Sequence, residues 1–279
     1  MPRSLVWATD IDVLPADHVV RRRDDHLVVR SPSNPTHYWG NLLVFDSPPR
    51  AGDRARWEAI FAAEFGDEPA IRHRTFCWDR TDDAVGAAPS EFESAGYGLE
   101  RTVGLVAAPR EIRPHPRANR DVLVRALSPA DEDLWEQVIE MQAAGRDADR
   151  FEEQAYREFS RRRLVDLREL FAAGQGSWYV ALLGDEVVGS CGIVVKDGRG
   201  RFQSVDTAAH QRRRGICSRL VAEAAHDAAV RHGAQTLVIA ADPQYHALGI
   251  YESLGFRPVE RVNGVCLQPT EDRAGALGE

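Results

Sequence analysis

Along the second half of the chain, the spacing of apolar residues changes from a helical period to short strand-like runs. Apolar residues at helical spacing predict two successive helices over residues 130–144 and 150–172, with Ser128-Pro129 as the start of the first. The runs that follow are apolar or alternating and end at glycine-containing turns, which is typical of strands and hairpins. Together with one strand before the helices, the predicted strands cover residues 121–127, 178–183, 187–195 and 201–207.

The pattern then returns to a helix. An amphipathic period predicts a helix over 216–232, with Gly233 as its stop. The remaining segments are predicted to be a strand at 236–241, a short helix at 247–254 and a last strand at 259–267. This order predicts an α/β domain with a mixed central β-sheet flanked by helices.

Residues 92–104 repeat the pattern of residues 251–264. With one residue inserted, the aromatic residue, the Glu-Ser pair, the Gly-aromatic pair, the Glu-Arg pair and the final glycine all agree. A predicted strand that ends in aspartate precedes each copy, at 71–79 and at 237–242. This ordered succession favours a duplicated fold over a chance match.

The segment 106–120 is the predicted boundary between the two copies, because it is rich in proline and arginine and has no sustained apolar period. The sequence thus predicts a first domain at 1–108, a linker at 109–120, a second domain at 121–268 and a flexible tail at 269–279.

Composition narrows the function classes. The 279 residues are 43% apolar and 28% charged, as in ordinary soluble globular proteins. Because no apolar run approaches the ~20 residues of a membrane span and the N-terminus has no signal-peptide core, we expect a cytoplasmic protein with no membrane partner. The net charge of −8 disfavours nucleic acid as a partner.

The four cysteines are scattered, with neither a C-x-x-C pair nor a histidine at metal-ligand spacing. We therefore expect buried reduced thiols at Cys77, Cys191, Cys217 and Cys266, and neither a disulfide framework nor a metal site. Cys191 lies in an apolar predicted strand without a paired base, so it is expected to be structural and not a nucleophile.

The junction between the strand at 201–207 and the helix at 216–232 carries the most informative chemistry. Backbone amides at a helix start point outward without partners, and the helix dipole adds positive potential, which together favour a phosphate group. Gly215 would let the backbone approach a ligand closely, and Ser218 could cap the helix or donate a hydrogen bond. The arginine run at 212–214 adds positive charge, although alone it would be read as a solvated helix cap.

Two motifs support the interpretation of this helix start as a phosphate site. Arg212-x-x-Gly215-x-Cys217 resembles the pyrophosphate-binding motif Gln/Arg-x-x-Gly-x-Gly/Ala of the GNAT superfamily, in the expected strand–loop–helix setting. Residues 247–256 resemble that family's second motif, of the kind Ala-x-x-Leu-Tyr-x-x-x-Gly-Phe. The resemblance covers residues 120–268 well and residues 1–108 faintly, through the repeat. Cys217 departs from the usual glycine or alanine.

The resemblance implies an N-acetyltransferase that moves an acetyl group directly from acetyl-CoA, its cosubstrate, to an amine. It places the pantetheine arm between two strands, one ending near Asp206 and one beginning near Leu237, with the Val205 or Asp206 amide as oxyanion donor. Gln244 stands where the family often has asparagine. The implied cofactor-binding residues are Val205, Asp206, Thr207, Arg212, Arg213, Arg214, Gly215, Ile216, Cys217, Ser218, Gln244 and Ala247.

For catalysis, the resemblance makes Tyr251 a general acid that protonates the departing thiolate, the alternative being a core aromatic. The general base is left open among Asp206, Glu152, Glu153, His246 and a chain of water molecules.

The first copy is expected to be inactive. Phe92 stands in the place of Tyr251 and has no proton to give, and prolines in the loop 47–53 remove the backbone donors of a phosphate cradle. The aromatic cluster at 36–41 could line an acceptor pocket, but core packing is the favoured interpretation.

The acceptor is expected to be a small-molecule amine or a peptide amine, and the sequence leaves open whether the chain forms a homodimer. Two alternative functions also stay open: a CoA-binding sensor or interaction module without catalysis, and an acyltransferase for a longer acyl-CoA.

Overall fold

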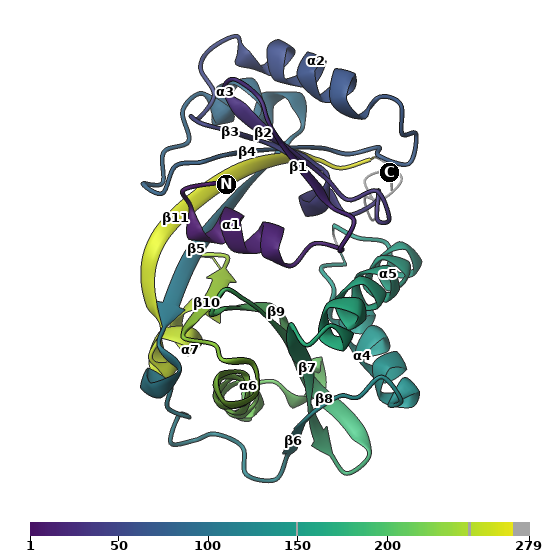
Figure 1. Ribbon diagram of the computed structural model, residues 1–279, viewed down its shortest axis with the longest axis vertical. Helices are drawn as coiled ribbons and strands as arrows, with labels where there is room; N and C mark the ends of the chain where they lie inside the picture. The colour runs from purple at the N-terminus through teal and green to yellow at the C-terminus, as the bar shows by residue number, and fades with distance from the viewer. Residues whose placement is uncertain (149, 245–246, 270–279) are drawn as a thin grey trace, which may run out of the picture. The chain divides into compact units, whose positions relative to one another are not determined.

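The computed structural model describes residues 1–148, 150–244 and 247–269. Contacts within the chain divide it into two compact units (Figure 1). One unit runs from Leu105 to Val259, and the other combines Met1–Gly104 with the residues from Glu260 onward.

The sheet of the second unit follows the order β10-β9-β8-β7-β6. Its strands are Leu123–Ala126 (β6), Gly176–Leu183 (β7), Glu186–Lys196 (β8), Arg199–Thr207 (β9) and Thr236–Ala241 (β10). Neighbouring strands are antiparallel except β9 and β10, which are parallel. Because parallel neighbours need a crossover connection, the helix Ile216–His232 (α6) joins them.

Helices cover both faces of this sheet. Figure 1 shows α6 on one side, and Glu132–Gly145 (α4) with Glu153–Ala172 (α5) on the other. On the α4 side, the rings of Trp135 and Trp178 lie 6.2 Å apart. On the α6 side, Gly189 leaves room for the side chains of Ile216 and Leu220. Ala247–Leu254 (α7) follows β10. The predicted α/β fold with a mixed sheet flanked by helices is confirmed.

The start of α4 differs from the prediction. The helix begins at Glu132, with Asp131 and not Ser128 as its N-cap. The Asp131 carboxylate accepts a hydrogen bond from the Ser128 amide at 2.7 Å and forms an ion pair with Arg125. Ser128-Pro129 therefore forms the turn before the helix.

The segment expected as a linker, 109–120, folds onto the second unit. Ile112 is buried, and the Arg113 amide donates to the Leu254 carbonyl at 3.0 Å. Gly255 lies so close to this segment that a Cβ would stand 2.7 Å from the carbonyl oxygen of Glu111. The units accordingly divide after Gly104 and not after residue 108, because the proline-rich segment is held by backbone hydrogen bonds and by a buried side chain.

The first unit repeats the strand–helix–strand arrangement. Its sheet follows the order β1-β2-β3-β4-β11, with bounds Val19–Arg22 (β1), His26–Arg30 (β2), Leu42–Phe45 (β3), Arg74–Trp78 (β4) and Arg257–Leu267 (β11). β3 and β4 are parallel and are joined by the helix Asp53–Phe65 (α2), as β9 and β10 are joined by α6. The first unit also contains Leu5–Asp12 (α1), Ala88–Glu91 (α3) and most of Gly98–Ala107 (β5). Buried aromatic residues fill its core, with Trp57 stacked on Phe45 at 3.8 Å.

The last strand belongs mainly to the first unit, although the sequence placed it in a second domain that ends at 268. β11 pairs antiparallel with β4, with Gly264 opposite Cys77. The Glu260 carboxylate also accepts hydrogen bonds from the Leu5 and Val6 amides at the start of α1, at 3.0 and 2.5 Å. Pairing covers the edge of β4, which would otherwise expose unpaired amides and carbonyls. The predicted tail lies, from residue 270 on, outside the described residues.

None of the helices in the described part of the chain is long and apolar enough to cross a membrane.

Candidate functional site

A bulge interrupts the pairing of β9 near its end. Gln203 lies opposite Gly192 and Asp206 lies opposite Ser190, so two residues of β9 face one residue of β8. Ser204 has a left-handed backbone, with φ at +43°. A bulge leaves an extra residue outside the ladder and re-aims its backbone groups. The residues beside it are Val205 and Asp206, which the sequence singled out as oxyanion donors.

The two parallel strands separate at the same end of the sheet. β9 and β10 pair only from Arg199 to Arg201 and from Thr236 to Val238 among the described residues. β9 continues to Thr207 and β10 to Ala241, so their carboxyl-terminal parts are not paired with each other. Ligands of open α/β sheets commonly bind beyond the carboxyl ends of such strands.

The first turn of α6 lies just beyond β9. Gly215 and Arg213 both have left-handed backbones, with φ at +76° and +60°. Within the part of the chain that the structure describes, the amides of Ile216, Cys217 and Ser218 meet no acceptor, as expected for a helix start. The side chains of Arg212, Arg213 and Arg214 are exposed around this turn. The structure thus brings these predicted residues together at one helix N-terminus.

Residues 115–119 brace the loop before α6, which the sequence did not indicate. A Cβ on Gly215 would stand 2.1 Å from the carbonyl oxygen of Arg117. Asn119 donates from its amide to the Gly215 carbonyl and from its side chain to the Arg214 carbonyl, each at 3.1 Å. The His115 amide donates to the Ser218 hydroxyl oxygen at 2.9 Å. Packing against this segment therefore requires the glycine, whether or not a ligand also approaches it.

Asp206 is a carboxyl group with a raised pKa at this end of the sheet. Burial raises the pKa of its carboxyl group to about 6, although the positive charge of Arg212 lowers it. Burial also raises the pKa of the Cys217 thiol, to about 12, and the negative charge of Asp206 contributes to this increase. Burial also raises the pKa of the fully buried Cys191 thiol, as expected for a structural cysteine and not for a nucleophile.

The other candidate bases are less suited to accept a proton. Glu152 caps α5 by accepting the Ala155 amide at 2.7 Å, and such backbone hydrogen bonds lower its pKa. Glu153 is exposed and pairs with Arg157 at 2.9 Å. His246 lies outside the described residues.

Tyr251 lies on the inner side of α7 and is 5% exposed. Its ring packs edge-on against Phe256 at 6.2 Å, and Phe256 packs against Phe202 of β9 at 5.9 Å. Gln244 is exposed, and its amide donates to the Asp242 carboxylate at 2.7 Å. Ala247 begins α7.

The equivalent loop of the first unit keeps the left-handed glycine but differs in charge. α2 follows Gly52, whose φ is +86°. Its first residue, Asp53, accepts the Arg50 amide at 2.8 Å. A hollow of about 240 Å³ here is lined by three aspartates, Asp25, Asp46 and Asp53, and by the arginines 50 and 56, the second of which pairs with Asp25 and Asp53. Carboxylates at a helix start oppose a phosphate group.

Phe92 and the cluster at 36–41 both pack inside the first unit. Phe92 is fully buried, with its ring 5.4 Å from that of Trp57. Trp39 stacks on Trp7 at 6.0 Å, and the Asn41 side chain donates to the Asn34 and His37 carbonyls. The cluster thus packs on buried residues of the first unit, although Tyr38 and Trp39 themselves stay partly exposed.

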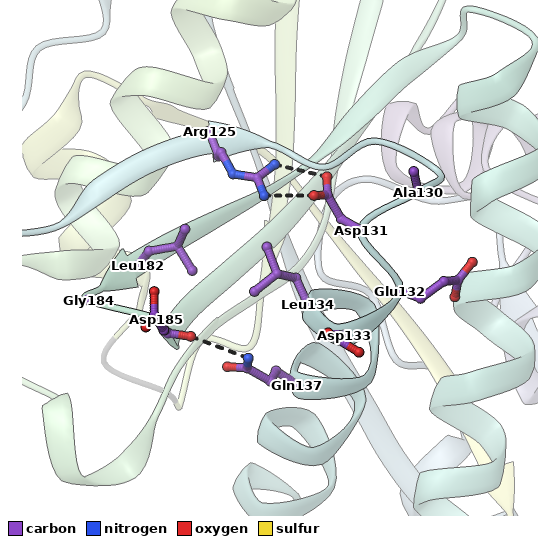
Figure 2. Close-up of a pocket in the computed structure, with 10 residues that line it drawn as sticks. All are labelled: Arg125, Ala130, Asp131, Glu132, Asp133, Leu134, Gln137, Leu182, Gly184 and Asp185. Carbon is purple, nitrogen blue, oxygen red and sulfur yellow. Dashed lines mark hydrogen bonds and ion pairs between the residues drawn. The ribbon is translucent and has the colours of Figure 1, made fainter.

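A second hollow, of about 590 Å³, lies at the start of α4 and the β7–β8 turn. Figure 2 shows Arg125 pointing to Asp131, with two hydrogen bonds of 2.8 and 2.9 Å, and Gln137 donating to the Asp185 carbonyl at 3.3 Å. Asp131 already neutralises the arginine, and Glu132 and Asp133 are acidic. This hollow is therefore poorly suited to a phosphate. In the described part of the chain, no group of three or more His, Cys, Asp or Glu residues could hold a metal ion.

Comparisons with known proteins agree with the fold. Residues 137–256 match the model of the acetyltransferase (GNAT) family, whereas no curated protein matches the chain. Among solved structures, a functionally unknown conserved protein from Staphylococcus epidermidis is 13% identical, with a TM-score of 0.72 over 90% of this chain and 94% of that one. A GCN5-related N-acetyltransferase from Kribbella flavida is 15% identical, with a TM-score of 0.62 over 95% and 93%. A tandem GNAT protein from the clavulanic acid biosynthesis pathway is 15% identical, with a TM-score of 0.54 over 96% and 89%.

At these identities the solved structures inform on the fold alone. The chain contains a GNAT-family acetyltransferase domain, and over nearly its whole length it shares the fold of GCN5-related N-acetyltransferases, a tandem one among them. The family predicted from the motifs at 212–217 and 247–256 is confirmed.

Proposed function

We propose that the protein is an acetyl-CoA-dependent N-acetyltransferase that moves an acetyl group directly from CoA to an amine. One observation carries this proposal: the bulged end of β9 and the open first turn of α6 meet at one end of the second unit's sheet. A helix N-terminus suits a pyrophosphate, and an amide at a bulge suits a thioester carbonyl that becomes negative during reaction.

The residues present fit acetyl-CoA in charge and in backbone geometry. The amides of Ile216, Cys217 and Ser218 would hold the pyrophosphate, with the arginines at 212–214 adding charge. Val205, Asp206 and Thr207 would lie beside the thioester end, where β9 and β10 separate. Gln244 and Ala247, before and at the start of α7, would contact the pantetheine arm.

The second unit's own residues would move the protons. Bound acetyl-CoA supplies an acyl group that is activated as a thioester. Asp206 would take a proton from the acceptor's ammonium group, so that the nitrogen lone pair can form the new C–N bond as the C–S bond breaks. The Val205 amide would donate to the carbonyl oxygen, and Tyr251 would give its phenolic proton to the departing sulfur. The second proton that the nitrogen loses as it becomes an amide would return through solvent to the Tyr251 phenolate, so that one net proton, first held by Asp206, is released.

Asp206 is the proposed base because its pKa of about 6 is close to the pH at which the reaction would run. Among the described residues, the titratable groups that interact electrostatically with Asp206 include Arg212, Tyr156, Cys191 and Cys217. Of these, only Arg212 is charged near neutral pH. Its positive charge keeps the pKa of the Asp206 carboxyl group from rising further.

Release of the CoA thiol in the presence of acetyl-CoA and a panel of amines tests the proposal. The double variant Arg212→Glu/Arg213→Glu reverses exposed charges at the first turn of α6, and we expect it to raise KM for acetyl-CoA at least about tenfold. Gly215→Glu is unsuitable, because its Cβ would strike the Arg117 carbonyl. The matched control is Arg50→Glu, in the equivalent loop of the first unit, which should leave KM unchanged. No amine-dependent thiol release with any acceptor would contradict the enzyme and leave a CoA-binding module.

A further inference from the structure

One hydrogen bond between helix α5 and strand β9 shows which residues of the two elements lie at the same level. The Arg163 guanidinium donates to the Gln203 side chain at 3.0 Å. Tyr156 is seven residues before Arg163, which is about 10 Å along a helix, and Asp206 is three residues after Gln203, about 10 Å along a strand. α5 runs antiparallel to β9, because α5 leads into β7 and β7 is parallel to β9 through β8. Tyr156 therefore lies above Asp206.

The side chain of Asp206 is on the face of the sheet that α5 covers. Asp206 is directly opposite Ser190, and Gln203 is directly opposite Gly192, so the alternation along β8 puts Asp206 and Gln203 on one face. The Trp178 ring, which contacts Trp135 of α4, lies against Gly192 on that same face. The negative charge of Asp206 also adds to burial in raising the pKa of Tyr156 to about 12, consistent with their proximity.

Aromatic rings surround this position. The ring of Tyr156 is 5.5 Å from that of Phe151 and 5.8 Å from that of Phe159. All three side chains are only half-buried. A half-buried aromatic surface beside a carboxylate combines the two features that bind an ammonium group on an apolar skeleton: charge at one end, and apolar and cation–π contact next to it.

Two buried hydroxyl groups flank the same position. Ser160 lies between Tyr156 and Arg163 on the buried stripe of α5, and Ser190 is the cross-strand neighbour of Asp206. Both side chains are at most 1% exposed, and neither hydroxyl oxygen has a hydrogen-bond partner. Buried polar groups normally have partners, so these two hydroxyls, one opposite Asp206 in the sheet and one a helical turn from Tyr156, indicate a place for a hydrogen-bonding ligand.

We propose that the acceptor is an alkyl- or arylalkylamine, bound in the second unit with its ammonium group at Asp206 and its apolar part on Phe151, Tyr156 and Phe159. This substrate class rests on the proposed function, since it names the acceptor of the same reaction. The hydroxyl oxygens of Ser160 and Ser190 would accept hydrogen bonds from those ammonium N–H groups that do not bond to Asp206. A hydrophilic amine of similar basicity would gain the charge contact but not the contact with the rings.

The test compares 2-phenylethylamine and hexylamine with ethanolamine and spermidine, using the full chain and saturating acetyl-CoA. We expect kcat/KM to be at least about tenfold higher for the first pair, as one well-placed aromatic contact provides. Tyr156→Ala should remove most of this preference, whereas Tyr156→Phe should retain it. Phe171→Ala, a half-buried aromatic near the other end of α5, is the matched control and should leave the preference unchanged.

Equal or better use of the hydrophilic amines would overturn this acceptor class, as would a loss in Tyr156→Ala that is the same for all four amines. Calorimetric binding of acetyl-CoA to each variant separates the two proposals. Acetyl-CoA binding without a preference for apolar amines overturns only the acceptor class, whereas absence of acetyl-CoA binding to the wild type overturns the proposed function.

Discussion

Replacing Asp206 with asparagine removes a carboxyl group that burial holds at a pKa of about 6, against an ordinary value of 3.8. The folded protein binds this proton more tightly than the unfolded chain, so the group favours folding most at pH values below 3.8. That contribution is lost as the pH rises through 6. The difference between the two pKa values lowers the free energy of unfolding at high pH by at most about 3 kcal/mol. About 1.4 kcal/mol of this loss develops between pH 5 and pH 8.

Asp206→Asn should therefore raise the free energy of unfolding more at pH 8 than at pH 5, by about 1.4 kcal/mol. Urea denaturation of both proteins at both pH values measures this difference. The same variant should remove the rising limb of the kcat/KM profile, which in the wild type is expected to have its midpoint near pH 6. If the variant has the same relative stability at both pH values, Asp206 is well solvated and the argument for it as the base fails.

Three further substitutions test separate parts of the structure. Tyr251→Phe should lower kcat by about tenfold or more without changing CoA affinity, and an unchanged kcat would make Tyr251 a packing residue. Glu260→Gln weakens the cap of α1 and should lower the free energy of unfolding in urea by about 1–2 kcal/mol. The loss should exceed that of Glu100→Gln at the equivalent position of the repeat, and equal losses would refute the capping role. Asn119→Ala removes the hydrogen bond to the Arg214 carbonyl and should weaken acetyl-CoA binding about three- to tenfold by calorimetry, and unchanged affinity would show that this brace does not matter for binding.

The helices and strands of the second half could be predicted because their determinants are local. Gly233 ends α6 in a left-handed conformation, as its position in the pattern indicated. The hairpin turn at Asp197-Gly198 likewise follows from its residues, both of which have positive φ. The predicted start of α4 was wrong, because the Asp131 carboxylate holds the Ser128 amide and Arg125 in a turn and the helix begins only at Glu132.

Other features depend on partners far away in the sequence. The sequence of residues 259–267 predicts a strand but not its pairing with β4, because a strand pattern carries no information about which strand lies next to it. The same holds for the brace at 115–119, whose hydrogen bonds reach residues 214–218.

Part of the candidate site could likewise be predicted from the sequence, and part could not. The motifs located the first turn of α6 and Tyr251, since each is carried by a short run of residues. The sequence did not indicate Tyr156, Ser160 or Ser190. Ser190 lies opposite Asp206 through the register of β8 and β9, and Tyr156 lies near Asp206 through the position of α5 on the sheet. A strand pattern does not show the register of its neighbour, and the only sequence signal of Tyr156 and Ser160 is their helical spacing.

Calorimetric titration of the full chain with acetyl-CoA measures whether the second unit alone holds the cosubstrate. We expect one site per chain, which is lost or greatly weakened in Arg212→Glu/Arg213→Glu and unchanged in Arg50→Glu. Absence of binding to the wild type, two sites per chain, or loss of binding in Arg50→Glu would contradict this expectation.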